Sequence, residues 1–163
     1  MSSAVISPCG TWRYRLDRTV QPKGLVFLFC GVNGSTATGE EEDQTTMKWR
    51  GFTLRNNGAR YIAINPFAFR ATDVRELATA VDPVGPDNTR YVVEALAEAD
   101  IIVPCWGNRS KVPQQLRWRF DAMMQRFIKS GKPIKTFGLT QSDDPKHPLM
   151  LGYDTPLVDW ARP

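Results

Sequence analysis

Several features that would place this protein in other classes are missing from its sequence. The 163 residues contain no apolar run of the roughly 18–20 residues that a membrane-spanning helix needs. The best candidate, residues 25–32, has only the length of a buried strand. The N-terminus also lacks the basic stretch followed by an apolar stretch that is typical of a secretory signal. We therefore expect a cytoplasmic protein that does not act in a membrane.

Cysteine is scarce as well. The three cysteines, Cys9, Cys30 and Cys105, are widely spaced and odd in number. This spacing argues against a disulfide scaffold, a four-cysteine iron–sulfur cluster and a zinc site. We expect no metal and no cofactor, and a reducing compartment is the natural location.

What is present is typical of a globular protein, with 42% hydrophobic and 23% charged residues. The length fits a single domain, residues 1–163, with its core between residues 12 and 160. The net charge of +4 favours polyanionic partners, although ordinary surface charge explains it equally simply. Basic residues form two groups, which predict either a phosphate-facing flank or a solvated helix face. The groups are Arg13, Arg15 and Arg18, and Arg109, Lys111, Arg117, Arg119, Arg126, Lys129 and Lys132.

Apolar strand patterns alternate with helical patterns along the chain. The hydrophobic periodicity predicts strands at residues 12–20, 25–30, 61–64, 101–105 and 133–139, and helices at 45–56, 73–80, 89–99 and 114–130. Such alternation indicates an α/β fold, a three-layer sandwich with a mainly parallel central sheet. Right-handed crossovers place the loops that follow the parallel strands at one edge of the sheet, where ligands bind in such folds.

Each buried strand is followed by an unusual polar cluster. Taken singly, the members have structural explanations: glycines suit tight turns, asparagine caps helices, phenylalanine packs in cores, and a lone histidine usually makes a structural hydrogen bond. Taken together, they predict a pocket for a flat, polar ligand, because a carboxamide can read a nucleobase edge and an aromatic ring can stack on it. The predicted binding residues are Gly31, Gly34, Ser35, Thr36, Asn65, Phe67, Phe69, Arg70, Trp106, Gly107 and Asn108, with Asn33, Asp43 and His147 as candidate catalytic residues.

The ordered motifs resemble the domain-of-unknown-function family 1643 (DUF1643). They are GVNGSTA at 31–37, EDQT at 42–45, NPFAFRATD at 65–73, DPVGPDN at 82–88, WG at 106–107 and HPL at 147–149, within a resemblance that runs from Tyr14 to Trp160. That family usually shows Asn-Pro-Ser-Thr-Ala-Asp and Asp-Asp-Pro-Thr at the first two motifs. In the first motif, this chain has Gly34 in place of the proline and Thr38 in place of the final aspartate. In the second motif, it has Glu42 in place of the first aspartate and Gln44 in place of the proline.

A more distant resemblance is to the uracil-DNA glycosylase superfamily, and it implies the fold of that superfamily. Gly31, Asn33 and Gly34 are similar to its Gly-x-Asp/Asn-Pro motif, and Asn65 stands where its base-reading asparagine ends the second core strand. Trp106 and Gly107 match a common end of its third strand. His147 and Pro148 are similar to its His-Pro-Ser-Pro motif, although the serine is absent here.

This resemblance implies a mechanism for base excision from nucleic acid. A base rotates out of the stack into the pocket, where Asn65 reads its edge and Phe67 or Phe69 stacks on its face. His147 donates to a base oxygen as negative charge develops there. Asn33 orients the attacking water, and Asp43 is the available carboxylate if a base is needed.

Two function classes follow from these residues. One is a glycosylase-like hydrolase that acts on a nucleobase in nucleic acid or a nucleotide. The other is a non-catalytic nucleotide or modified-base binding protein that has the pocket without the chemistry. The missing proline and serine favour the second class, and the presence of Asn33, Asn65 and His147 favours the first. The sequence leaves the oligomeric state open.

Overall fold

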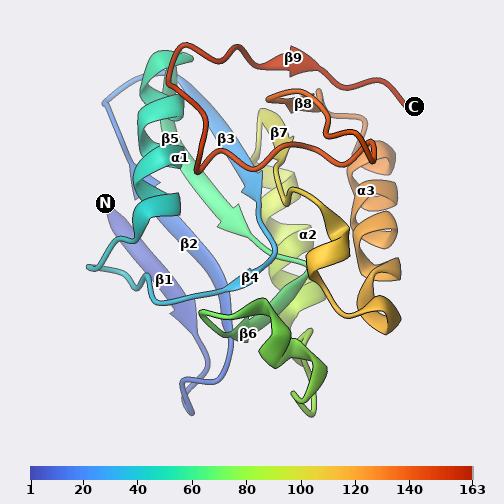
Figure 1. Ribbon diagram of the computed structural model, residues 1–163. Helices are drawn as coiled ribbons and strands as arrows, with labels where there is room; N and C mark the ends of the chain where they lie inside the picture. The colour runs from blue at the N-terminus through green and yellow to red at the C-terminus, as the bar shows by residue number, and fades with distance from the viewer. Residues whose placement is uncertain (163) are drawn as a thin grey trace.

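The computed structural model describes residues 1–162 and contains a five-stranded sheet with helices on both faces (Figure 1). The strand order is β1-β2-β5-β3-β7, and β5, β3 and β7 are parallel to one another. Antiparallel pairing joins β2 to β5 and β1 to β2 at the other edge. The bounds are β1 Ser2–Ile6, β2 Arg13–Thr19, β3 Leu25–Cys30, β5 Gly58–Ile64 and β7 Ile101–Pro104.

Three α-helices complete a three-layer α/β arrangement. Helix α1 (Gln44–Arg55) covers one face, where Trp49 and Phe52 pack in a cluster with the strand residue Phe29. Helices α2 (Asn88–Glu98) and α3 (Trp118–Ser130) cover the other face, and their apolar residues pack with Leu28 and Ile62. Strand β3 is apolar throughout because both of its faces are covered. Within residues 1–162, no helix is long and apolar enough to cross a membrane.

Local signals explain where the helices begin and end. Helix α1 starts after Asp43, whose carboxylate accepts a hydrogen bond from the Thr46 amide at 2.8 Å, while the Thr46 hydroxyl accepts one from the Asp43 amide at 2.9 Å. The chain leaves α1 through Asn57, which has a left-handed φ of 59°. Helix α3 ends at Gly131, whose φ of 73° favours glycine, as the sequence predicted.

Three predicted elements are corrected by the structure. The expected helix at residues 73–80 is a 3-10 turn over Val74–Ala78, capped by Asp73 instead of Thr72. The expected helix at 114–130 is a short 3-10 turn over Gln114–Leu116 followed by α3. The expected core strand at 133–139 is reduced to one parallel bridge between Ile134 and Ile102 of β7 and to β8 (Lys135–Thr136), which pairs with β9 (Val158–Asp159) outside the main sheet.

A short parallel pair lies below the main sheet in Figure 1 and shapes the functional edge. Strand β4 (Asn33–Gly34) pairs with β6 (Phe67–Arg70), so the segments that follow β3 and β5 are held side by side. The C-terminal chain then runs past α1, where the Tyr153 ring packs 5.2 Å from Phe52, before it reaches β9. These two features bring the post-strand loops and the segment around residue 147 to the same end of the molecule.

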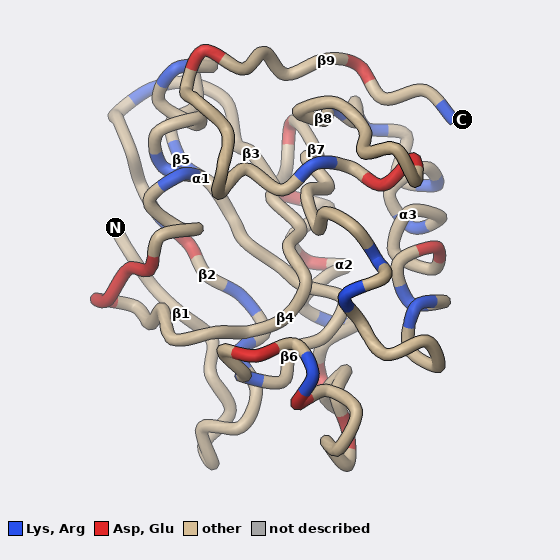
Figure 2. Tube along the Cα trace, viewed as in Figure 1, with Lys and Arg blue, Asp and Glu red and all other residues tan. Residues whose placement is uncertain are grey.

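The early basic group does not form an exposed flank. Arg13 and Arg18 are only 3% and 2% exposed, and Arg15 forms ion pairs with Asp17 and Glu98. In the second group, basic and acidic residues are interspersed along α3 (Figure 2). The acidic residues at 40–43 form one continuous red stretch on the loop that leads into α1.

Candidate functional site

A cavity of about 330 Å³ opens at the carboxyl ends of β3 and β5, next to the β4–β6 pair. It brings together six of the residues predicted from sequence, Gly31, Asn33, Ser35, Asp43, Asn65 and His147. The other lining residues are Arg13, Val32, Thr45, Trp49, Ala71, Thr72, Val74, Lys111 and Leu149. The volume falls in the range of about 300–1,000 Å³ that is typical of small-molecule sites.

Asn33 presents an acceptor to the cavity. Its Nδ2 donates to the Gly34 carbonyl at 2.6 Å and to the Ala71 carbonyl at 2.7 Å, so both amide protons are used by the backbone. Its Oδ1 is therefore the atom that remains for a ligand or a water molecule. Because β4 pairs with β6, the backbone itself holds this side chain in one orientation.

Asn65 ends β5 and carries a carboxamide that the protein leaves free. The residue is 2% exposed and lines the cavity, and its side chain makes no hydrogen bond within residues 1–162. Its backbone carbonyl accepts from Asn88 Nδ2 at 3.0 Å, which fixes the turn after the strand. The neighbouring Gly31 leaves room for this side chain, since a Cβ there would lie 2.9 Å from Asn65 Oδ1.

His147 is held as a neutral hydrogen-bond donor. Burial, with a smaller contribution from the nearby Lys111 charge, lowers the pKa of its imidazole to about 4, although Asp43 opposes the shift. Its Nδ1 accepts a hydrogen bond from the Leu149 amide at 3.1 Å. The ring proton therefore resides on Nε2, where it can be donated.

Two cations and an aromatic ring in this cavity were not assigned to the site from sequence. Burial lowers the pKa of Arg13 to about 10, and its guanidinium donates to the Ala37 carbonyl at 3.0 Å. Desolvation by the surrounding protein lowers the pKa of Lys111. Trp49 of α1 stacks on Phe29 at 5.7 Å and contributes to the cavity wall. The signal for Lys111 was its position soon after β7, whereas Arg13 and Trp49 lie on elements with no visible link to the site.

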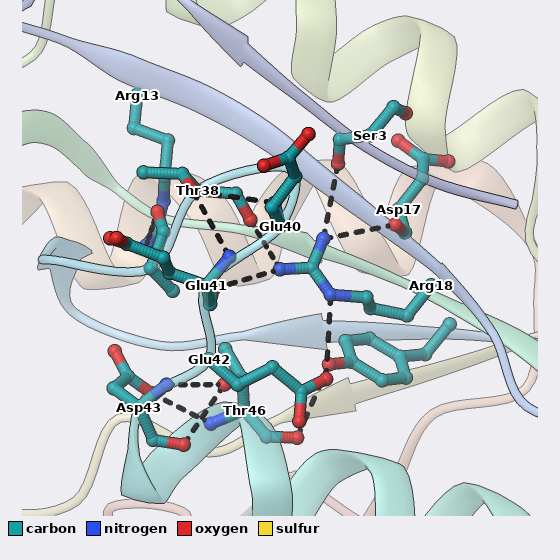
Figure 3. Close-up of polar contacts among 12 residues, drawn as sticks. Ser3, Arg13, Asp17, Arg18, Thr38, Glu40, Glu41, Glu42, Asp43 and Thr46 are labelled. Carbon is teal, nitrogen blue, oxygen red and sulfur yellow. Dashed lines mark hydrogen bonds and ion pairs between the residues drawn. The ribbon is translucent and has the colours of Figure 1, made fainter.

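Asp43 has a structural duty in addition to its place in the cavity. One carboxylate oxygen caps α1 through Thr46. The segment before it is held by Arg18, which donates to the carbonyls of Thr38 and Glu41 (Figure 3). Arg18 also forms an ion pair with Glu42 at 3.5 Å, so a buried arginine positions the loop that carries Asp43.

Other predicted binding residues lie away from this cavity on the β4–β6 side. Phe67 is fully buried and packs edge-on against Phe120 at 5.9 Å, so its ring is in the core. Phe69 is partly buried and packs against the same core cluster. Arg70 donates through Nε to the Ser35 carbonyl at 3.1 Å. Gly34 permits close backbone contact, and Thr36 is exposed; neither residue lines the cavity.

The segment after β7 lines other cavities. Trp106 is 1% exposed, packs 5.2 Å from Phe120, and borders a separate cavity beside Arg109. Gly107 and Asn108 line a third cavity of about 440 Å³ that shares Lys111 and His147 with the first. Within residues 1–162, no group of three or more histidine, cysteine, aspartate or glutamate side chains is placed to hold a metal ion.

Comparison with known proteins identifies one family. No curated protein and no solved structure matches the chain. A family model described as "Protein of unknown function (DUF1643)" matches residues 13–149, which include the whole cavity wall. The chain therefore belongs to the DUF1643 family.

Proposed function

We propose that this cavity recognises a nucleobase presented by a nucleic acid or a nucleotide. The observation that carries the proposal is the Asn65 side chain, which lines the cavity in a residue only 2% exposed and makes no hydrogen bond within residues 1–162. A ligand that fills the cavity takes this carboxamide out of water, so a ligand that replaces the lost hydrogen bonds is favoured over one that does not. A carboxamide offers a donor and an acceptor in one plane, which matches the edge of a base.

The surroundings of Asn65 support a flat ligand with a carbonyl group. Trp49 gives the cavity an aromatic wall, the role that the sequence had suggested for Phe67 or Phe69. The Nε2 proton of His147 is available to a base oxygen. Because the imidazole is neutral at pH 7, it acts as a hydrogen-bond donor without bringing a full charge into the cavity.

Hydrolysis of the N-glycosidic bond is the second candidate function, and the free Oδ1 of Asn33 favours it. In this reaction a water oxygen would bond to C1′ as the C1′–N bond breaks and the base departs with the electron pair. His147 would stabilise the charge that develops on the base oxygen, and Asn33 would orient the water. Asp43 would accept the proton released by the water. The order of these residues along the chain, similar to that of the uracil-DNA glycosylase superfamily, supports this candidate.

The test is a screen of free bases, nucleosides, nucleotides and short oligonucleotides by calorimetry, with product analysis for released base. Asn65→Ala removes the reading group and should weaken binding of the preferred base by about tenfold or more. Gln115→Ala, which removes an exposed carboxamide that does not line the cavity, is the matched control. Binding without base release would support the non-catalytic alternative, and no base-dependent binding by the wild-type protein would refute the proposal.

A further inference from the structure

The base-binding cavity and the third cavity are adjacent and have two lining residues in common. Lys111 and His147 line both of them. The third cavity has a volume of about 440 Å³, and its remaining lining residues are Gly107, Asn108, Ser110, Thr140, Lys146 and Leu151. A ligand bound beside His147 in the first cavity therefore lies next to this space.

The lining of the third cavity is rich in donors and contains no carboxylate. Lys111 and Lys146 supply two ammonium groups, and neither forms an ion pair within residues 1–162. The Asn108 side chain makes no hydrogen bond to cap the turn that follows it. Thr140 Oγ1 accepts from the amides of Ser142 and Asp144, which leaves its own proton to donate. Such a set of unused donors fits an anion.

Arg109 provides a contrast on the same segment. Its Nε lies 2.9 Å from Asp144 and its Nη1 lies 3.1 Å from Asp121, so two carboxylates neutralise its charge. The charge of Arg109 is thus explained by the structure of the protein. The charges of Lys111 and Lys146 are not, and both line the same cavity.

We propose that the third cavity is a phosphate subsite, which holds the phosphate of the nucleotide or nucleic acid whose base occupies the first cavity. This assignment rests on the proposed base recognition and narrows the ligand to a phosphate ester. Lys111 is the bridging residue, because it can reach toward the phosphate while it borders the base. Lys146, Asn108, Ser110 and Thr140 complete the anion site.

The experiment compares affinities for a nucleoside, its 5′- and 3′-monophosphates, inorganic phosphate, and a short single-stranded oligonucleotide. In the wild type, a phosphate-bearing ligand should bind at least about tenfold more tightly than the nucleoside, as expected for charge-assisted hydrogen bonds. Lys111→Met and Lys146→Met should each reduce this gain and flatten its salt dependence, while nucleoside affinity stays unchanged in Lys146→Met. Lys129→Met on α3 is the control and should change nothing.

The outcomes separate this proposal from the base-recognition proposal. Equal wild-type affinity for nucleoside and nucleotide would overturn the phosphate subsite while leaving base recognition intact. Lysine-dependent binding of inorganic phosphate without any contribution from a base would refute base recognition and support the subsite. Comparison of monophosphates with the oligonucleotide identifies whether the phosphate belongs to a free nucleotide or to a polymer.

Discussion

His147 is the only histidine in the sequence, so its ionisation can be followed by NMR without ambiguity. We expect the imidazole to titrate with a midpoint near pH 4, well below its ordinary value of 6.5. Burial is the largest cause, and the positive charge of Lys111 adds to it. The hydrogen bond from Leu149 to Nδ1 also predicts the Nε2–H tautomer, which the ring ¹⁵N shifts report directly.

This depressed pKa has a consequence for stability with a definite sign. The unfolded chain binds a proton at His147 below pH 6.5, whereas the folded protein does so only near pH 4. Stability from this group is therefore fully present above pH 6.5 and is lost as the pH falls toward 4. The difference between the folded and unfolded pKa values of His147 corresponds to about 3 kcal/mol of stability, of which about 2.5 kcal/mol is lost by pH 4.5.

Denaturant unfolding at pH 7.5 and pH 4.5 measures this loss. The wild type should lose about 2.5 kcal/mol more between these pH values than His147→Gln, which cannot titrate there. Lys111→Met should raise the His147 midpoint, because it removes a like charge, and Asp43→Asn should lower it further. A wild-type midpoint near 6.5, or shifts of the opposite sign in these variants, would refute the burial and the neutral-donor role of His147.

Three further substitutions test the supports of the site. Arg18→Met should lower the free energy of unfolding by about 3 kcal/mol, and Tm by roughly 6–12 °C, because four backbone carbonyls lose their donor. The control is Arg75→Met, which removes an exposed ion pair and should leave Tm unchanged. Gly31→Ala should displace the Asn65 carboxamide and weaken ligand binding at least about tenfold, and unaltered affinity in calorimetry would contradict this reasoning. Asp43→Ala should cost about 1 kcal/mol by loss of the helix cap, and Asp43→Ser should restore most of it in thermal melts.

Elements with strong local signals were predicted well from sequence. Strand β3 is continuously apolar, and α3 combines an apolar stripe with a glycine stop. The prediction of a helix at 73–80 was wrong. Leu77 is the one buried residue of the turn found there, which is too little burial to stabilise a longer helix. The strand predicted at 133–139 is found only in part, because the segment bridges to β7 at Ile134 alone and Gly138, with a φ of 101°, ends the extended chain after β8.

The candidate site was predictable in part for a physical reason. Asn33 and Asn65 follow parallel neighbours, β3 and β5, whose carboxyl ends must share one edge of the sheet. Arg13 lies at the start of β2 and reaches the same edge only because β2 pairs antiparallel with β5. The sequence also did not determine whether the aromatic rings after β5 face the cavity or the core. In the structure, the Phe67 ring of β6 packs against Phe120 in the core.

The sequence by itself determined which segments form strands and helices with apolar faces, because the period of hydrophobic residues is a local property. It also determined that polar residues follow the parallel strands, whose carboxyl ends lie at the same edge of the sheet. Only the tertiary structure decided that Arg13, Trp49 and Lys111 line the same cavity as Asn65, and that Lys111 also lines a neighbouring cavity with Lys146. Those contacts join residues far apart in the chain. They depend on how the strands pair and how the helices pack on the sheet, which is determined by the burial of the whole core.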